Sequence, residues 1–460
     1  MMNNPNPIST YLKPGVRVHL VGIGGVSMCP LAEVLHGMGL QIQGSDMNES
    51  DTVKHLRSAG ISVAIGHNAE NLGDCDLVIR TAAVHDGNPE IAGAVSRGIP
   101  VYERAQAWGA IMQHYPNALC VAGTHGKTTT TSMCAHIFLA AQRDPSVMLG
   151  GVLPIMGAGH RSGKGDTIIL ESCEYCNSFL SFFPTVAVIL NVDADHLDFF
   201  KDLEDIKHSF RRFAQLVPED GFVVADADDA NTMDAIDHID RRVVTFGLDQ
   251  GDVHAANLSW DHGFAIFDVI AHGQQYAHVR LSVPGIHNVR NALAAAASAL
   301  CLNVPGPAVE EGLYAFHGAG RRFEAKGQYH GAKIYDDYAH HPQELRALLT
   351  TVNQLGYDRV ICAFQPHTYS RTKELFSDFV DVLKLADLTV LAPIFAARET
   401  DTLGVSSTQL AQQIPGAISC ASLEEVTDTL AKLAKPGDLI LTVGAGDIYL
   451  AGEALAEKQD

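Results

Sequence analysis

No apolar run in the 460-residue sequence approaches the roughly 20 residues of a membrane-spanning helix. Basic residues are also scarce, since 32 Lys and Arg stand against 53 Asp and Glu and leave a formal net charge of −21. A surface of that charge repels nucleic-acid phosphates and anionic lipid headgroups, although a few local amides and cations can still hold one phosphate. We therefore expect neither a nucleic-acid-binding nor a membrane-binding protein.

The cysteines show no regular spacing, and the sequence shows no pattern typical of a secretory leader. The nine cysteines are odd in number and scattered, which is typical of thiols in a reducing compartment. Cys173 and Cys176 form one C-x-x-C pair, and a single pair without a second is a poor zinc site. The N-terminal segment MMNNPNPISTYLKPG has no charged and then apolar signal pattern. These features predict a cytoplasmic protein.

Short runs of Val, Ile and Leu alternate with helix-length segments along the chain, and this pattern indicates an α/β fold. Hydrophobic residues make up 47% of the chain, enough for a large core, and its length predicts two to four domains. The expected strands are 18–22, 77–82, 118–123, 167–171, 186–191, 221–225, 242–247, 359–364, 388–393 and 438–443.

The pattern changes between about 252 and 284, where apolar and polar residues alternate around His-Gly turns. This stretch predicts antiparallel hairpins added to a parallel core. A strand, a glycine loop and a helix follow one another near 18, 118 and 332. We therefore expect three α/β domains: Rossmann-like residues 1–116, a central domain 117–321 with a mixed sheet, and Rossmann-like residues 322–460.

The first glycine loop, VHLVGIGGVSM, places Gly22, Gly24 and Gly25 between a buried strand and a helix starting near Ser27. Such a loop lets backbone amides approach a diphosphate, and Asp46 stands where a ribose-binding acid is expected. The loop is equally consistent with NAD, with another nucleotide diphosphate, or with a tight turn that binds nothing. It is weak evidence by itself.

The second glycine loop is stronger, because a buried strand precedes it and an amphipathic helix is expected after it. Its Gly-Lys-Thr ending is that of a P-loop, in which amides cradle phosphates, Lys127 reaches the β and γ oxygens and Thr128 binds magnesium. Val121 stands where the usual spacing has glycine, so the motif is a shortened variant. The nucleotide-binding residues expected here are Gly123, Thr124, His125, Gly126, Lys127, Thr128 and Thr129.

Metal ligands are expected at the ends of two later strands. Glu171 ends TIILE, and the segment VAVILNVDADHLD carries its acids and a histidine just past a strand. Strand ends beside a P-loop face the γ-phosphate, so a carboxylate there can hold magnesium. His196 is either a second-metal ligand or a turn histidine. The other candidates in that segment are Asp193, Asp195 and Asp198.

GTHGKTTT, NVDADHLD and PGIHNVRNALAA together resemble the Mur ligase family of ATP-dependent amide-forming enzymes. RRFE, YDDYAHHPQEL, FQPHTYSRT, FAARE and VGAGDI extend the resemblance over the last third of the chain. The resemblance implies a UDP-sugar domain, a central ATPase and a C-terminal Rossmann-like domain. It also implies that ATP converts the carboxylate of UDP-N-acetylmuramate to an acyl phosphate, which L-alanine then attacks, giving ADP and phosphate in peptidoglycan precursor synthesis.

The same resemblance implies a role for each matching residue. Lys127 would clamp the phosphates, Thr128 and Glu171 would hold one Mg²⁺, and His196 a second. Asn288 and Asn291 would read adenine, or else cap the helix that follows them. Arg322 would reach a phosphate of ATP and Asp337 its ribose. The substrate contacts would be Gly22, Gly24, Gly25, Asp46, Tyr338, His341 and Arg371, the last on the carboxylate of L-alanine.

Some related alanine ligases have a basic residue where this chain has Thr368, so the carboxylate clamp rests mainly on Arg371. Several relatives carbamylate a lysine, and no such lysine is assigned here; the helix after His196 offers Lys207. A recycling ligase that attaches a tripeptide to UDP-N-acetylmuramate is the nearest alternative. A nicotinamide-dependent oxidoreductase and a nucleotide-regulated binding switch are alternatives from other classes.

Overall fold

The computed structural model describes residues 7–458 except 26, 82, 198, 262, 398 and 402, so Asp198 and Arg398 of the motifs above lie outside the described residues. The chain forms two compact units. One comprises Met1–Asn257, Phe267–Val279 and Arg290–Phe316, and the other Leu258–Ile266, Arg280–Val289 and His317–Asp460. Across the described residues, no helix combines the length and apolar character needed to span a membrane.

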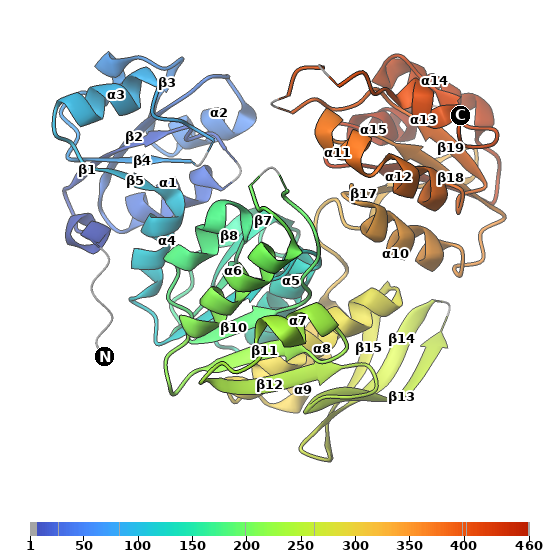
Figure 1. The fold of residues 1–460 in the computed structure, drawn as a ribbon, viewed down its shortest axis with the longest axis horizontal. Helices are drawn as coiled ribbons and strands as arrows, with labels where there is room; N and C mark the ends of the chain where they lie inside the picture. The colour runs from blue at the N-terminus through green and yellow to red at the C-terminus, as the bar shows by residue number, and fades with distance from the viewer. Residues whose placement is uncertain are drawn as a thin grey trace. The chain divides into compact units, whose positions relative to one another are not determined.

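The N-terminal segment forms a five-stranded parallel sheet in the order β3-β2-β1-β4-β5 (Figure 1). The strand order reverses at β1, and ligands of open parallel sheets bind where it reverses. The strands are β1 (Arg17–Val21), β2 (Gln41–Asp46), β3 (Ser62–Ile65), β4 (Leu77–Arg80) and β5 (Val101–Glu103). The helices are η1 (Pro7–Tyr11), α1 (Met28–Gly37), α2 (Asp51–Ser58), η2 (Ala69–Leu72), α3 (Pro89–Ser96) and α4 (Arg104–Met112).

The central sheet has ten strands in the order β15-β14-β13-β12-β11-β10-β6-β9-β7-β8. They are β6 (Asn117–Ala122), β7 (Ser146–Leu153), β8 (Ala158–Arg161), β9 (Thr167–Glu171), β10 (Val186–Ile189), β11 (Phe222–Asp226), β12 (Arg242–Gly247), β13 (Val253–Asp261), β14 (Phe264–Ala271) and β15 (Gln274–Pro284). The accompanying helices are α5 (Lys127–Ala140), η3 (Tyr175–Ser181), α6 (Leu203–Gln215), α7 (Ala230–Ala235), α8 (Ile286–Cys301) and α9 (Gly306–Ala315).

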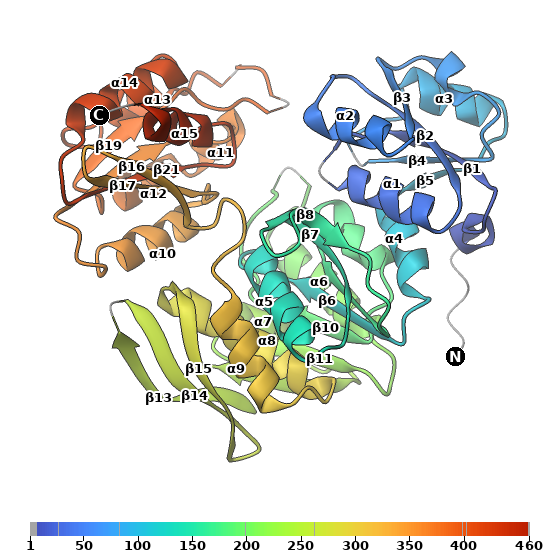
Figure 2. The same cartoon turned by 180° about the vertical axis from the view of Figure 1, so that it is seen from behind.

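The chain leaves β6 in one direction along this sheet and returns to add β10, β11 and β12 on its other side. The loops after β6 and β10 therefore meet at a reversal of strand order. Figure 1 shows α6 and α7 on one face of the sheet, and Figure 2 shows α5 and α9 on the other. Because α5 packs under α9, it is buried from Thr130 to Phe138 and is not the amphipathic helix expected from the sequence.

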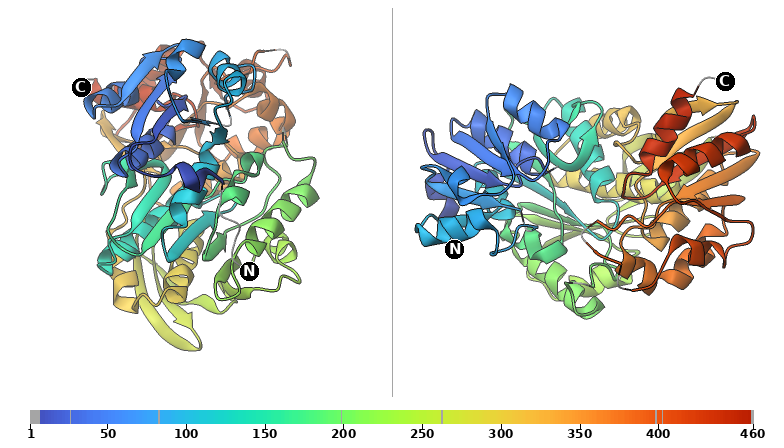
Figure 3. Two further views of the ribbon diagram at one scale, coloured as in Figure 1. Left: turned by 90° about the vertical axis from the view of Figure 1, so that its left-hand side faces the viewer. Right: turned by 90° about the horizontal axis from the view of Figure 1, so that it is seen from above.

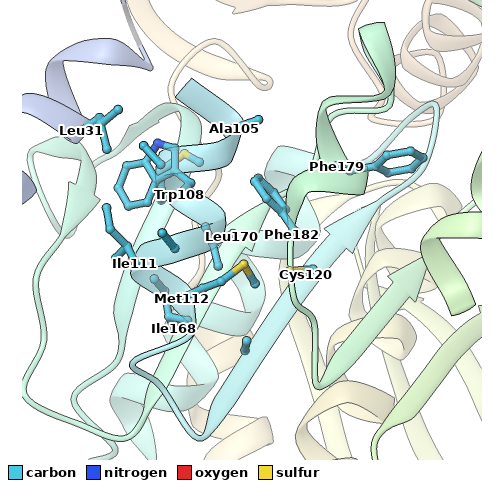
Figure 4. Close-up of a cluster of buried hydrophobic side chains, with 14 of the residues drawn as sticks. Leu31, Ala105, Trp108, Ile111, Met112, Cys120, Ile168, Leu170, Phe179 and Phe182 are labelled. Atoms are coloured by element: carbon cyan, nitrogen blue, oxygen red, sulfur yellow. The ribbon is translucent and has the colours of Figure 1, made fainter. Parts of the chain in front are cut away.

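Helix α4 belongs to the N-terminal segment but shares a core with the central sheet (Figure 4). Trp108, Ile111 and Met112 are buried in the same cluster as Leu170 and Phe182. At Gly109 a Cβ atom would stand 2.0 Å from the carbonyl oxygen of Ser181, so only glycine permits this approach of α4 to η3. One continuous core therefore joins the first sheet to the second.

The third sheet has the order β16-β17-β21-β18-β19-β20 and is parallel except for the pair β16–β17. Residues alternate across it: Val360, Cys362 and Phe364 of β18 join one core, and Ile361 and Ala363 join another. Helices α10 and α12 pack in the first core and α14 and α15 in the second. Figure 3 gives two further views of the ribbon.

The strands of the third sheet are β16 (Glu324–Tyr329), β17 (Ala332–Asp337), β18 (Arg359–Phe364), β19 (Leu388–Leu391), β20 (Ile418–Ser419) and β21 (Asp438–Val443). Its helices are α10 (Pro342–Val352), α11 (Tyr369–Glu374), α12 (Phe376–Leu383), α13 (Ser407–Ala411), α14 (Leu423–Leu433) and α15 (Tyr449–Glu457).

The predicted α/β class is confirmed, and each of the ten expected strands is present within two residues of its expected bounds. The expected hairpins are also confirmed, because β14 and β15 are neighbours joined by His272 and Gly273 alone, which only an antiparallel pair allows. The sequence reading overlooked β2, whose alternating polar residues obscure a strand that lies beside β1 in the sheet.

Candidate active site

The P-loop follows β6, and its glycines are sterically required. Gly123 and Gly126 have φ values of +145° and +84°, which side chains on L-residues rarely allow. A Cβ on Gly126 would also stand 2.6 Å from Oδ1 of Asn291. The loop therefore keeps its backbone close to α8, and α5 starts directly at Lys127.

The ammonium group of Lys127 is held inside this loop. Its Nζ donates to the carbonyl oxygens of Gly123 and Thr124 and to both carboxylate oxygens of Glu174, the latter at 3.1 and 3.3 Å. Glu174 is 2% exposed. Burial alone would lower the pKa of Lys127, but the negative charges of Glu174 and of nearby groups outweigh that effect and raise it. Lys127 is therefore a fixed cation at the end of β6.

Glu171 and Thr128, the predicted metal ligands, lie together. The hydroxyl of Thr128 donates to Oε2 of Glu171 at 2.9 Å, and the backbone N–H of Gly150 donates to the same oxygen at 2.8 Å. A hydroxyl and a carboxylate are hard oxygen donors, which suit Mg²⁺. The described residues contain no group of three or more His, Cys, Asp or Glu arranged for a metal.

His196 also lies near Glu174. Its Nε2 atom is 3.9 Å from Oε1 of Glu174 and 3.8 Å from Oδ2 of Asp195, and its ring lies 4.8 Å from that of Tyr175. Its φ of +55° is uncommon for a residue other than glycine. Glu174 therefore stands between the predicted phosphate-binding lysine and the predicted second-metal histidine, a link that the sequence reading did not identify.

The loop after β10 is bonded directly to the P-loop. Asn191 accepts from the N–H of His125 at 2.7 Å and donates to its carbonyl at 3.1 Å. The N–H of Asp193 donates to the hydroxyl of Thr124 at 2.9 Å. Thr124 and His125, expected as phosphate-contacting residues, are thus also the residues that connect the two loops.

Asn288 and Asn291 lie three residues apart in the first turns of α8 and so face the same side of the helix. The amide of Asn288 donates to the carbonyl of Pro284 at 2.7 Å, and this side chain is buried. Asn291 is the asparagine that approaches the P-loop, at Gly126. The adenine contact of both residues remains a prediction.

In the first glycine loop, Gly22 has a φ of +78° and its carbonyl accepts from the N–H of Gly25 at 3.1 Å. Asp46 binds the loop itself, accepting from the N–H of Gly24 at 2.9 Å. A Cβ on Gly24 would stand 2.8 Å from Val53, so a side chain there would disturb the loop before it met any ligand. The diphosphate and ribose contacts of this loop stay predictions.

The second compact unit gathers the C-terminal candidates at the end of β17. Asp337 is buried and accepts from the N–H groups of Phe323 and Ala339, both at 2.8 Å. The guanidinium group of Arg322 lies 5.0 Å from the ring centre of Tyr338. His341 is the N-cap of α10, where its Nδ1 accepts from the N–H of Gln343 at 3.4 Å.

Arg371 lies in the first turn of α11, and its guanidinium group is 3.3 Å from Nδ1 of His367. Glu399 accepts from the N–H of Ser370 at 2.9 Å and from its hydroxyl, and these bonds hold the pKa of its carboxyl below the usual value despite partial burial. Thr368, the residue before α11, has a φ of +66° and a ψ of 147°, a strained backbone for a β-branched side chain.

Glu174 and Glu399 are the side chains that the sequence reading missed. Glu174 comes three residues after Glu171, so a second acid beside a strand end was a usable signal. Glu399 falls in FAARE, far from the other motifs, and nothing local to it predicts contact with Ser370. All nine cysteines are free thiols, as expected, and Cys173 and Cys176 are partly exposed.

Three segments of the chain match Mur ligase domains. Residues 17–116 match the Mur ligase family catalytic domain, 121–299 the Mur ligase middle domain and 321–446 the Mur ligase glutamate ligase domain. The chain is 46% identical to the UDP-N-acetylmuramate–L-alanine ligase of Clostridium novyi, over 96% of this chain and 98% of that one. It is 44% identical to the enzyme of that name from Acetivibrio thermocellus, over 96% of each chain.

Solved structures agree with these similarities. The UDP-N-acetylmuramate–alanine ligase of Thermotoga maritima superposes with a TM-score of 0.82 at 30% identity, covering 96% of this chain and 98% of that one. A murein peptide ligase from Psychrobacter arcticus gives a TM-score of 0.72 at 24% identity, with coverage of 96% and 98%, which shows the shared fold.

Burial raises the pKa of Asp337 to about 6, against opposing effects of Arg322 and of the two N–H groups. A carboxyl whose pKa is raised by folding stabilises the protein when protonated, and this contribution is lost as the pH rises through the folded-state value. The quantity to follow is the unfolding free energy of the wild type minus that of Asp337→Asn. We expect this difference to fall by up to about 1.4 kcal/mol per pH unit between pH 5 and 6, and to level off above about pH 7. Urea titrations measure it.

The exposed Asp249→Asn variant provides the baseline for these titrations. A difference between wild type and Asp337→Asn that stays constant with pH would contradict the buried, raised-pKa state of Asp337.

Proposed function

The chain belongs to the Mur ligase family, and we propose that it uses ATP to join L-alanine to the carboxylate of UDP-N-acetylmuramate. The single observation that carries the proposal is the Lys127 site, a fixed cation in a P-loop at the point where the central strand order reverses. Similarity to L-alanine ligases along 95–97% of the chain supports this amino acid over a tripeptide. Mur ligase similarity across residues 17–116 leaves the nicotinamide alternative without support.

The reaction has two steps. A carboxylate oxygen of the sugar attacks the γ-phosphorus of ATP, the bond to the β-γ bridging oxygen breaks, and ADP leaves. The neutral amine of L-alanine then attacks the acyl carbon, the tetrahedral intermediate expels phosphate, and the nitrogen loses a proton. Negative charge gathers on the phosphoryl oxygens in both steps, so fixed cations and amide donors supply most of the catalysis.

The residues around Lys127 fit these steps. Lys127 stabilises the transferred phosphoryl group, while Thr124, His125, Gly126 and Thr129 form the loop that receives the phosphates. Thr128 and Glu171 would hold one Mg²⁺ and His196 would hold a second. When bound, Mg²⁺ supplies positive charge that offsets the charge of the phosphates and of the sugar carboxylate. Glu174 keeps Lys127 in place and so acts as its positioning partner.

Further contacts are proposed for the remaining candidates. Asn288 and Asn291 would pair with adenine, whose ring and exocyclic nitrogens match a side-chain amide. Arg322 would bind a phosphate and Asp337 the ribose. For the sugar nucleotide, the amides of Gly22, Gly24 and Gly25 would take the diphosphate, with Asp46 at the ribose. Arg371 would hold the alanine carboxylate, near Tyr338 and His341.

We also propose domain boundaries after residues 116 and 321 and a cytoplasmic location. The first and second sheets are separated between β5 and β6, and the second and third between β15 and β16. The shared core of α4 makes the first boundary a change of sheet and not a break in packing. Nine free thiols are consistent with a reducing compartment.

Release of phosphate from ATP tests the function directly. We expect it to depend on UDP-N-acetylmuramate and L-alanine together. An equal or better rate with the tripeptide than with L-alanine would indicate the recycling ligase instead, and NADH oxidation in a parallel cuvette would indicate an oxidoreductase.

Lys127→Ala removes the cation that stabilises the transferred phosphoryl group. We expect turnover to fall by a factor on the order of 10² or more. The exposed Lys432→Ala in α14 should leave turnover unchanged. Because the substitution strands the buried Glu174 carboxylate, folding needs checking by circular dichroism, and the double variant with Glu174→Gln removes that unpaired charge. Near-normal turnover in either folded variant would refute the P-loop assignment.

Arg371→Lys keeps the charge but loses the planar fork that binds a carboxylate through two parallel hydrogen bonds. We expect the KM for L-alanine to rise roughly 10-fold or more, about 1.4 kcal/mol of binding, while the KM values for ATP and UDP-N-acetylmuramate move much less. Arg346→Lys on the exposed side of α10 serves as the matched control. An unchanged L-alanine KM would remove Arg371 from the site.

A further inference from the structure

The loop after β10 carries Asp195 and His196, yet its described residues, 190–197 and 199–202, form no helix or strand. Val192 in this loop is 1% exposed, so its backbone N–H and C=O groups need hydrogen-bond partners inside the protein. With β10 ended, the sheet no longer supplies them.

Two side chains at the start of α7, the N-cap Asp229 and Asn231 in the first turn, provide both partners. The N–H of Val192 donates to Oδ2 of Asp229 at 2.8 Å, and the side-chain amide of Asn231 donates to the carbonyl of Val192 at 2.9 Å. The same Asp229 carboxylate accepts from the N–H of Asn231 at 3.0 Å and from the hydroxyl of Thr232 at 3.0 Å. Both backbone groups of Val192 are thus hydrogen-bonded to Asp229 and Asn231, which are also bonded to each other.

The residues on each side of Val192 are the ones bonded to the P-loop, Asn191 through His125 and Asp193 through Thr124. The hydrogen bonds therefore run without a break from Asp229 through residues 191–193 to the loop that holds Lys127. Asp202, at the exit of the same loop, is a helix N-cap like Asp229: it caps α6 through the N–H of Asp205 at 3.0 Å, as Asp229 caps α7. The bond that distinguishes Asp229 is the one to the N–H of Val192.

We propose that Asp229 and Asn231 are positioning residues that hold the loop after β10 on the P-loop and thereby place His196 beside Glu174. This proposal deepens the function proposed above. Its kinetic consequence, a loss of kcat, rests on that function. Its structural consequence does not rest on that function, since the hydrogen bonds that hold the loop are formed within the chain.

Asp229→Ala frees the N–H of Val192, whereas Asp202→Ala removes a helix cap of the same chemistry that does not bond residues 191–193. In Asp229→Ala, hydrogen exchange followed by mass spectrometry should show faster exchange of a peptide covering residues 190–197. In Asp202→Ala, residues 191–193 of that peptide should exchange as in the wild type. Equal exchange at 191–193 in the two variants would overturn the proposal.

Kinetics give the second readout. Misplacement by a fraction of an ångström lowers turnover, so kcat should fall about 10-fold or more in Asp229→Ala, while the KM for L-alanine stays within about twofold. Asn231→Ala should show a smaller loss in the same direction, and Asp202→Ala none. A rise in the L-alanine KM with kcat unchanged would overturn the proposal.

A double-mutant cycle distinguishes positioning from a simple loss of stability. If Asp229 acts through residues 191–193, its effect on kcat should shrink in a Thr124→Val background, where the bond to Asp193 is already lost. Additive effects would overturn the proposal. Should Asp229→Ala fail to fold, Asp229→Asn, which keeps only one acceptor oxygen, takes its place in every arm.

Failure of the proposed function gives a different pattern. An unaltered chain without L-alanine-dependent phosphate release would refute the function, and hydrogen exchange would still decide whether Asp229 holds the loop.

Discussion

The buried contact between Lys127 and Glu174 is the interaction on which the central site depends. A lysine taken out of water needs a partner, and Glu174 together with two P-loop carbonyls supplies it. Oε1 of the same carboxylate lies 3.9 Å from Nε2 of His196, so Glu174 lies next to both the P-loop lysine and the histidine of the loop after β10. Phosphate oxygens offer Lys127 the same kind of negative partner, which is why this arrangement suits a nucleotide-using ligase.

The sheets explain why the proposed functional residues occur where they do. In the first sheet the glycine loop follows β1, at which the strand order reverses, and in the central sheet the P-loop follows β6 at an equivalent place. In the third sheet Asp337 ends β17, and Arg371 lies in α11, which follows β18; both strands pair with β21. Three segments of different sequence thus share one arrangement: a glycine-containing or polar loop lies at the carboxyl end of a buried parallel strand.

Much of this could be predicted from sequence, because buried parallel strands are nearly continuous apolar runs and glycine loops have fixed spacing. The P-loop, Glu171 with Thr128, and the hairpins after residue 252 all follow from such local patterns. Glu174 was overlooked because its importance arises from contacts with Lys127 and His196, 47 and 22 residues away. The contact of Asp46 with its own glycine loop and the burial of α5 on every side were also not expected. Both result from tertiary packing, which a local sequence pattern does not show.

The proposed reaction requires that phosphoryl transfer from ATP activates the sugar carboxylate before L-alanine attacks. UDP-N-acetylmuramate labelled with ¹⁸O in its carboxylate tests this most directly, with mass spectrometry of the phosphate released in the presence of ATP and L-alanine. We expect one ¹⁸O atom in each phosphate, because the carboxylate oxygen that attacks the γ-phosphorus leaves with it. Phosphate without label would contradict it, since water would then have been the nucleophile.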